Sequence, residues 1–371
     1  MKKKIVWLTS DCFVDCDFDK DILQEILKVY SIEWYILLPV EESRYKNYDF
    51  SQLGKLNGIN IHLFEFSHKN GSFMRIMDYF RLFSRIKRDN YDIIYINCPP
   101  TPLLLPFVMT LDSRKTIMTA HQGEVHKGFS NPWKHKLIRY FVYHKVSKIN
   151  MFSISQAALM AKHFPKAKIN TMNLSLKDFG RPNTSLQKDN KHVVFSSFGT
   201  INYGKHIDLL IDAACNIYEQ GVRNIRIKIF GQCDNWEFYK NKIRYPEIFE
   251  CKIQLIDNKE IPDLFCSSHF FVQPYRIVTQ SGPLKIAFNY NIPVICSDLQ
   301  GFKDEVKEDV NGLLFASENA EDLQKTLLKA IDIVEKGKYD NLKERMKDYV
   351  TANYSTSHIA ELYINMFNQI Q

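Results

Sequence analysis

The feature that most constrains this chain is a regular alternation of short β-rich apolar runs with segments of helical periodicity. Ile5–Leu8 and Trp34–Leu38 have the composition of buried strands, and residues 21–30 between them repeat apolar side chains at helical spacing. Further strands are expected at residues 60–66, 91–97, 114–119, 151–155, 192–198, 225–230, 252–256, 270–273 and 293–297. Further helices are expected at residues 72–88, 133–146, 208–219, 284–290, 321–335 and 357–370. Such alternation predicts an α/β fold with parallel sheets and helices on both faces.

A polar segment divides this alternation into two series. Residues 180–191 have no hydrophobic period and are interpreted as a linker between domains. The length of 371 residues also suits two domains better than one. The sequence therefore predicts two Rossmann-like, doubly wound domains, at residues 1–180 and 190–350, that face each other across a cleft. Ligands of such sheets bind at the carboxyl ends of the strands.

The net charge indicates the class of binding partner, and the cysteines and apolar runs indicate the cellular location. The formal net charge is +7, without the dense basic clusters of a nucleic-acid binder, so no nucleic-acid partner is expected. Nucleotide phosphates or an anionic membrane surface fit better, although a slightly basic soluble protein is equally compatible with this charge. The 8 cysteines are scattered and indicate free thiols in a reducing cytosol. No apolar run has the length of an export signal or a membrane span, so we expect a cytoplasmic protein.

The strongest local signal is the segment 273–285, where a buried strand runs into a polar loop and a Ser-Gly-Pro sequence opens a helix. Proline in the first turn favours a helix start, and the free N–H groups of a helix N-terminus form an anion site. Arg276 and Lys285 are expected to add positive charge nearby. The alternative is a capped helix without a ligand.

Two further junctions carry candidate functional residues. In the segment 198–206, a strand runs into a glycine-bearing loop before a helix, and Lys205 stands where its ammonium could reach a diphosphate. This signal is weak alone because such turns are common. In the segment 119–124, His121 follows a strand. Taken alone, His121 is better explained as a hydrogen-bonded loop histidine.

Most of the chain resembles the GT-B glycosyltransferases of family four, retaining enzymes that build bacterial surface polysaccharides. The resemblance is strongest from about Val193 to Phe315, and in the first half it depends mainly on Thr119-Ala120-His121 and Ser153 to Gln156. The matching residues of the second half are Phe198-Gly199 with Lys205, Ile229 to Gly231, Glu260 to Phe265, Pro274-Tyr275, Pro293 to Ile295, Gly301 to Val306 and Asn311 to Phe315. In that family the last helix crosses back, which implies that residues 355–371 complete the first domain.

The resemblance also implies roles for individual residues. His121 would contact the donor sugar near the reacting carbon, and Lys205 would bind the donor diphosphate. The amides of Ser281 and Gly282 would hold the distal phosphate. Three residues are implied to border the nucleobase: Gly231, Asn258 and Ile261. The other implied donor-binding residues are Gly199, Asn202, Tyr275, Thr279 and Gln280.

The chain departs from the family pattern at three positions. The family usually has two glutamates with seven residues between them, and a gapless alignment places Val278 and Ile286 there; the second of these glutamates normally binds the ribose. An arginine usually stands three residues before the lysine, where this chain has Asn202. The sequence resembles the Thr-Gln-Ser-Gly subgroup, in which Gln280 and Ser281 act near the phosphate. The alternative is a catalytically degenerate, nucleotide-binding scaffold of a polysaccharide assembly complex.

The implied activity is transfer of a hexose-type sugar from a UDP- or GDP-linked donor to a glycan or lipid-linked acceptor, as in capsule or O-antigen synthesis. No Asp-x-Asp element follows a strand in a suitable loop, so we expect neither a metal nor another cofactor. Retention by front-face attack would need no enzyme base. A nucleotide-sugar epimerase on the same fold is the rival enzyme, but it needs acid/base carboxylates of which the sequence has no clear set.

Two segments of the first half, 73–88 and 134–145, mix aromatic and basic residues. Helices of this composition can lie in a membrane interface with their apolar face down. We therefore expect peripheral binding to an anionic surface, such as the inner face of the plasma membrane. The alternative, helices that only cover the sheet, is equally favoured for the first segment. The second segment is denser in Lys, Arg and Tyr and is the better candidate, with Lys134, Lys136 and Arg139 expected to meet the anionic surface.

Overall fold

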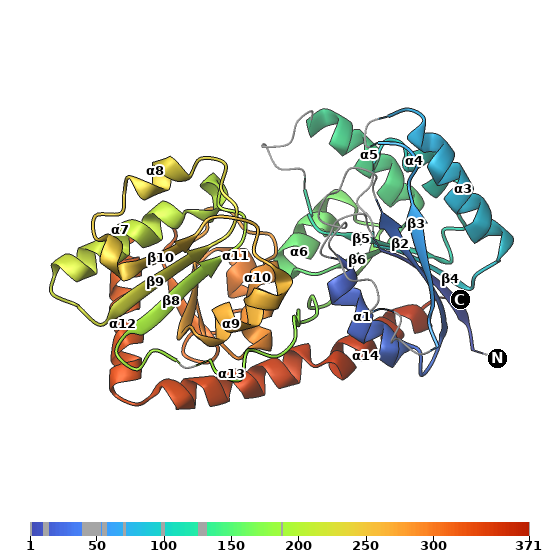
Figure 1. The fold of residues 1–371 in the computed structure, drawn as a ribbon. Helices are drawn as coiled ribbons and strands as arrows, with labels where there is room; N and C mark the ends of the chain where they lie inside the picture. Colours follow the sequence, from blue (N-terminus) through green and yellow to red (C-terminus); the bar gives the residue numbers. More distant parts are fainter. Residues whose placement is uncertain are drawn as a thin grey trace. The chain divides into compact units, whose positions relative to one another are not determined.

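The structure, a computed structural model, describes residues 2–9, 15–38, 53, 58–69, 72–97, 101–124, 132–186 and 188–370 (Figure 1). The chain divides into two compact units. The first comprises Met1–Ser175 with Tyr354–Gln371, and the second comprises Leu176–Asn353. Each unit contains its own parallel sheet.

The first unit is built on a seven-stranded sheet with the order β3-β2-β1-β4-β5-β6-β7. Its strands are β1 (Lys4–Thr9), β2 (Ser31–Leu38), β3 (Asn60–Glu65), β4 (Ile93–Asn97), β5 (Thr116–Ala120), β6 (Lys148–Met151) and β7 (Lys168–Thr171). Its helices are α1 (Asp15–Ile26), α3 (Arg75–Arg88), α4 (Leu105–Val108), α5 (Pro132–Lys145), α6 (Ile154–His163) and α14 (Thr356–Asn368). The central strands β1, β4 and β5 are buried along almost their whole length, which explains their continuous apolar runs.

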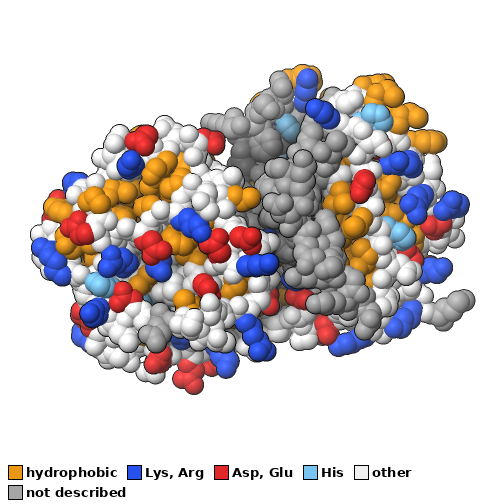
Figure 2. All heavy atoms as spheres, viewed as in Figure 1, with side chains coloured by type: hydrophobic (Ala, Val, Ile, Leu, Met, Phe, Trp, Pro, Cys, Tyr) orange, Lys and Arg blue, Asp and Glu red, His pale blue; other side chains and the backbone are white. Residues whose placement is uncertain are grey.

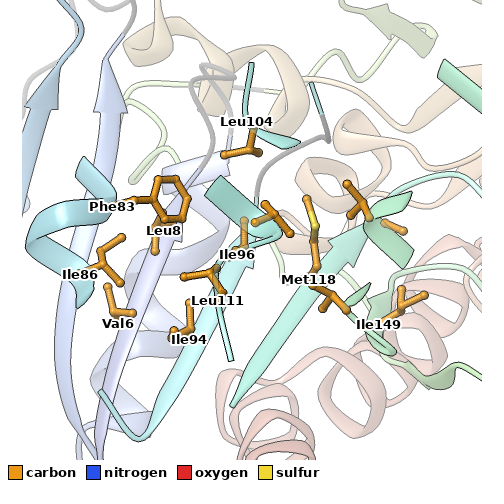
Figure 3. Close-up of a cluster of buried hydrophobic side chains, with 14 of the residues drawn as sticks. Val6, Leu8, Phe83, Ile86, Ile94, Ile96, Leu104, Leu111, Met118 and Ile149 are labelled. Carbon is orange, nitrogen blue, oxygen red and sulfur yellow. The ribbon is translucent and has the colours of Figure 1, made fainter. Parts of the chain in front are cut away.

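Alternate residues of the central strands enter two separate cores, one on each face of this sheet. Figure 3 shows the first core, in which Val6 and Leu8 of β1 share a buried cluster with Phe83 of α3. On the opposite face, the ring centroids of Trp7 and Tyr363 lie 5.1 Å apart. The C-terminal helix α14 therefore packs on the sheet of the first unit, where it also contacts α1.

The second unit is built on a six-stranded sheet with the order β10-β9-β8-β11-β12-β13. Its strands are β8 (Val193–Phe198), β9 (Ile225–Phe230), β10 (Phe249–Lys252), β11 (Phe270–Gln273), β12 (Val294–Ser297) and β13 (Gly312–Phe315). Its helices are α7 (Ile207–Glu219), α8 (Trp236–Lys240), α9 (Ile261–Cys266), α10 (Gly282–Asn289), α11 (Gln300–Lys303), α12 (Ala320–Glu335) and α13 (Tyr339–Tyr354). Short 3₁₀ helices span Tyr203–Lys205, Pro246–Ile248 and Asn258–Glu260. Phe195, Ile227 and Val272, from three neighbouring strands, are fully buried in one core.

Two expected strands are misplaced relative to the structure. The strand expected at 151–155 is β6, which ends at Met151. The hydroxyl of Ser153 instead accepts a hydrogen bond from the Gln156 N–H at 3.3 Å and caps α6, a local bond that competes with strand pairing. The strand expected at 252–256 is β10, which ends at Lys252 because its ladder with β9 ends there.

The sequence prediction also missed β13, although its residues were singled out as a motif. Gly312 begins this strand, and a Cβ atom on it would lie 2.4 Å from the Val294 carbonyl oxygen. The close approach of β13 to β12 therefore requires glycine, a residue that weakens a strand signal. The helices α6 and α13 and the strand β7 were not expected either. Within the described residues, no helix combines the length and the apolarity needed to cross a bilayer.

The packing of α14 generates the first prediction. Phe367 is fully buried, and its ring meets those of Trp7 and Tyr30 edge-on at 6.2 and 5.8 Å. Phe367→Ala should lower the free energy of unfolding by about 3–5 kcal/mol, because it leaves a cavity between α14 and the sheet. Glu361→Ala, at an exposed position of the same helix, is the matched control. Denaturant unfolding of the full chain measures the difference, and equal stability of the two variants would contradict the packing.

Candidate functional site

A pocket lies in the second unit at the carboxyl end of its sheet. It lies between the loops that follow β8 and β11, which are paired neighbours in the sheet. The residues that line it are Ser197, Phe198, Gly199, Thr200, Ile201, Lys205, Ile207 and Tyr275. This edge of a parallel sheet is where ligands of doubly wound folds bind. The pocket therefore gathers three of the predicted site residues, Gly199, Lys205 and Tyr275.

Two glycines hold the loop after β8 against the end of β9. Gly199 has φ +123° and Gly231 has φ +147°, and both values favour glycine. A Cβ atom on Gly231 would lie 1.9 Å from the Gly199 carbonyl oxygen. The Gly199 N–H donates to the Phe230 carbonyl at 3.0 Å, so the two backbones run in direct contact. Gly231 is thus not among the residues that line the pocket, but its backbone contacts Gly199, which does line it.

Lys205 ends the 3₁₀ turn Tyr203–Lys205, which leads into α7. Its ammonium nitrogen lies 3.7 Å from the centroid of the Tyr275 ring, a distance typical of a cation–π contact. Tyr275 is buried, with 2% of its surface exposed. Among the described residues, no carboxylate forms an ion pair with Lys205. Its three N–H donors therefore remain available to an anion in the pocket.

One buried amide joins this lysine site to the start of α10. The Gln273 Nε2 group donates to the Tyr275 hydroxyl at 2.9 Å and to the Ser281 hydroxyl at 2.6 Å. Ser281 is the N-cap of α10, and its hydroxyl also accepts from the Leu284 N–H at 3.3 Å. The N–H groups of Ser281 and Gly282 form no hydrogen bond with any described residue. The helix start thus presents backbone donors, as an anion site requires.

The two cations that were expected beside this helix start are both engaged elsewhere. Lys285 is 1% exposed and forms an ion pair with the buried carboxylate of Glu305. Burial holds the pKa of the Lys285 amine well below its usual value. Arg276 forms an ion pair with Asp208 at 3.5 Å. The positive charges that were expected near the helix start are therefore each paired with a carboxylate.

The remaining predicted donor-binding residues lie around the pocket or away from it. Asn202 is exposed before the turn that ends at Lys205. Thr279 and Gln280 are partly buried in the loop before α10. Asn258 and Ile261 follow β10, which β9 and β8 separate from β11, and neither lines the pocket. The structure therefore does not bring these last two residues to Lys205.

His121 belongs to the first unit, where it follows β5. Its ring lies 5.6 Å from that of Phe152. The next residues are held on two sides: the Gly123 N–H donates to the Gln156 side chain at 2.9 Å, and Arg139 Nη2 donates to the Gln122 and Gly123 carbonyls at 2.8 and 3.0 Å. A Cβ atom on Gly123 would lie 2.2 Å from the Gln156 carbonyl oxygen. The loop that carries His121 is thus fixed by α5 and α6.

Sequence reasoning assigned no role to Gln273, and it assigned Arg139 only to a basic helix expected to face a membrane. The signal for Gln273 is an amide at the end of the fully apolar run Phe270-Phe271-Val272, because a buried amide must find partners. Arg139 was interpreted only as one of several basic residues on a helix. For metal binding, the His, Cys, Asp and Glu side chains of the described ranges form no group of three or more that could hold an ion.

Two comparisons relate the sequence to known proteins. Residues 181–350 match the family described as Glycosyl transferases group 1. A curated relative, glycogen synthase of Thermodesulfovibrio yellowstonii, is 26% identical over 193 residues, which are 50% of this chain and 36% of that protein. The chain thus spans only about a third of that relative. The residues that match the family model lie within the second unit of this chain.

Solved structures share the fold over the whole chain. A glycosyltransferase from Rickettsia africae has a TM-score of 0.73 at 13% identity and covers 100% of this chain and 98% of its own. The Anabaena protein Alr3699/HepE, in complex with UDP and glucose, has a TM-score of 0.72 at 13% identity and covers 99% of both chains. At such identities the likeness concerns the fold alone. It confirms the predicted fold class, two parallel sheets with alternating helices as in GT-B glycosyltransferases.

The contact between the two glycines generates the second prediction. Gly231→Ala should destabilise the second unit by about 1–3 kcal/mol or more, because the new Cβ atom overlaps the Gly199 carbonyl. Gly221→Ala is the matched control: Gly221 also has a positive φ, +98°, but an added Cβ atom would meet nothing within 4 Å. Thermal melting of both variants separates steric overlap from backbone strain. If the two variants melt alike, the close contact does not exist in solution.

Proposed function

We propose that this protein is a glycosyltransferase that moves a sugar from a UDP- or GDP-linked donor to a glycan or lipid-linked acceptor in cell-surface polysaccharide synthesis. The observation that carries the proposal is the chain of contacts from Lys205 through Tyr275 and Gln273 to Ser281. This chain of contacts lies within the segment that matches the group 1 family. The complex of HepE with UDP and glucose supports a nucleotide-sugar donor for this chain as well.

The two ends of these contacts suit the two phosphates of the donor. The Lys205 ammonium offers a point charge with three donors. The start of α10 offers the N–H groups of Ser281 and Gly282, where the helix dipole favours an anion. The proposed contacts of the diphosphate are therefore one ammonium group and the backbone donors of a helix start. Gly199, Asn202, Thr279 and Gln280 belong to the same proposed donor site, with Gly231 beneath it.

The proposed reaction follows from the charge that develops as the donor breaks. The bond between the anomeric carbon and the phosphate oxygen breaks while the acceptor oxygen bonds to that carbon from the same face. Negative charge grows on the diphosphate, where Lys205 and the Ser281 amide stabilise it. The departing phosphate takes the proton of the acceptor hydroxyl, so the configuration is retained without an enzyme base. His121 contacts the donor sugar beside the reacting carbon.

One observation favours the second candidate, a nucleotide-binding scaffold without activity. Val278 and Ile286 stand where the resemblance expects glutamates, and Ile286 is buried with 3% exposure. No ribose-binding carboxylate is therefore available from those two positions. Release of free sugar from UDP- and GDP-sugars separates the two proposals, because a scaffold would bind the nucleotide and hydrolyse nothing.

The proposed site generates the third prediction. Lys205→Ala should remove a charge-assisted contact of roughly 2–4 kcal/mol in the transition state. Turnover in a donor-hydrolysis or transfer assay should fall by about two orders of magnitude or more. Lys325→Ala, at an exposed position of α12, is the control for the loss of one positive charge. Near-normal turnover of a folded Lys205→Ala variant would refute the assignment.

A companion variant separates binding of the nucleotide from transfer of the sugar. His121→Ala should leave the affinity for UDP or GDP unchanged, because His121 lies on the first unit. It should sharply reduce sugar transfer. If the nucleotide affinity falls while turnover is kept, His121 does not have the proposed role.

We further propose that the first unit binds an anionic membrane surface, which would give access to a lipid-linked acceptor. Here the α3–α5 surface denotes the exposed apolar side chains Phe73, Met74, Met77, Phe80, Trp133, Leu137, Tyr140 and Phe141. Phe73 is 75% exposed and Trp133 is 61% exposed. Figure 2 shows apolar side chains beside basic ones on the surface of the first unit. The opposite sides of these helices are buried in the core, for example Phe83 and Val142. Exposed apolar side chains on helices that also carry Lys and Arg favour a membrane interface.

The structure assigns the basic residues of α5 to two different environments. Lys134 and Lys136 are exposed. Arg139 points inward to the carbonyls of the His121 loop, and burial lowers its pKa. The expectation that Arg139 contributes to a membrane-facing charge is therefore corrected.

The α3–α5 surface generates the fourth prediction. Lys134→Glu combined with Lys136→Glu should weaken binding to anionic liposomes at low salt by at least about tenfold, at roughly 1 kcal/mol for each lost basic residue. Lys325→Glu combined with Lys347→Glu makes the same charge change at exposed positions of the second unit and should have no effect. Flotation with anionic and with neutral vesicles measures the membrane binding of both double variants. Binding that ignores lipid charge, or no binding, would leave these helices purely structural.

A further inference from the structure

Arg276 contacts the turn that carries Lys205 through both its backbone and its side chain. Its own N–H donates to the Gly204 carbonyl at 2.9 Å. Its guanidinium Nη1 donates to the Tyr203 carbonyl at 2.8 Å, and its Cζ lies 4.2 Å from the centroid of the Tyr203 ring. Nη2 reaches the Asp208 carboxylate in the first turn of α7 at 3.5 Å. Arg276 therefore contacts both the turn and the first turn of the helix that follows it.

The turn needs this support because its local geometry is unfavourable. The residue that follows the turn, His206, has φ 51° and ψ 38°, in the left-handed region that residues other than glycine rarely adopt. The side chain of the N-cap residue, His206, makes no capping hydrogen bond to the start of α7. The His206 Nδ1 atom is buried and has no hydrogen-bond partner among the described residues. Such a conformation persists only where surrounding contacts impose it.

Tyr275, the residue before Arg276, contacts the side chain of Lys205. Tyr275 supplies the ring on which the Lys205 ammonium lies, and Arg276 holds the backbone that leads to Lys205. The Arg276 side chain is 14% exposed and its charge is paired with Asp208. These two consecutive residues thus fix both the side chain and the backbone of the lysine.

We propose that Arg276, together with Asp208, is a positioning residue that pre-organises Lys205 for the diphosphate and does not itself contact the phosphates. This inference rests on the proposed donor site. A lysine that is held in place loses less rotamer freedom when it binds. The affinity for the diphosphate therefore depends on the contacts of Arg276 with the turn and with Asp208, here called the Arg276 clamp. The nucleoside part of the donor does not depend on it.

A double-mutant cycle on the full chain tests the proposal. Calorimetric titrations with UDP, GDP, uridine and guanosine are made on the wild type, Arg276→Gln, Lys205→Ala and the double variant. Arg276→Gln should weaken binding of the preferred nucleoside diphosphate by roughly tenfold, with nucleoside binding unchanged. In the Lys205→Ala background the same change should have no further effect, because the residue acts through the lysine.

Two other variants keep the test informative if Arg276→Gln folds poorly. Arg276→Lys keeps the charge but lacks the planar fork, so it should recover only part of the affinity. Asp208→Asn keeps the shape but removes the ion pair, and should shift the affinity in the same direction as Arg276→Gln. Melting curves of each variant control for loss of the fold.

The outcomes that would overturn the inference differ from those that would overturn the proposed function. Additive effects of Lys205→Ala and Arg276→Gln would mean that Arg276 contacts the phosphates directly. Unchanged diphosphate affinity in the folded Arg276 and Asp208 variants would remove any role for the clamp. Absence of UDP and GDP binding to the wild type, or no effect of Lys205→Ala, would instead reject the donor site itself and the clamp with it.

Discussion

The candidate site depends on the buried side-chain amide of Gln273. This group is fully buried, and a buried amide is costly unless its donors are satisfied. Its two N–H bonds fix the Tyr275 hydroxyl and the Ser281 hydroxyl at once. The aromatic ring that supports Lys205 and the N-cap of α10 are therefore held in one rigid arrangement at the end of β11. Positioning of this kind is what a preorganised anion site requires.

In each unit, close backbone contacts at a glycine and side-chain hydrogen bonds fix the loops that carry the candidate site residues. In the second unit, the direct contact of Gly231 with Gly199 brings two loops together where no side chain fits. In the first unit, Gly123 is equally crowded, and Arg139 and Gln156 hold its loop from two helices. Glycines supply the close approach and long polar side chains supply the hydrogen bonds. The proposed phosphate contacts and the proposed sugar contact are both placed by such neighbours.

Much of the fold was predictable from the sequence because parallel strands buried on both faces are continuous apolar runs. β11 was predicted with its exact bounds, whereas β10 and β6 were misplaced because edge pairing and the Ser153 cap, not apolarity, set their ends. Lys205, Tyr275 and Gly199 were predictable as neighbours, since they follow adjacent strands. The ion pairs of Lys285 with Glu305 and of Arg276 with Asp208 were not predictable from the sequence. Only tertiary packing brings these partners together.

The central claim is that the loops after β8 and β11 bind the diphosphate of a nucleotide. Hydrogen exchange of the full chain, with and without saturating UDP or GDP, tests it most directly. The account predicts that one of these nucleotides slows exchange of the backbone amides in residues 199–206 and 281–284, whereas the matching nucleoside leaves residues 281–284 unprotected. Protection confined to other parts of the chain, or none with either nucleotide, would contradict it.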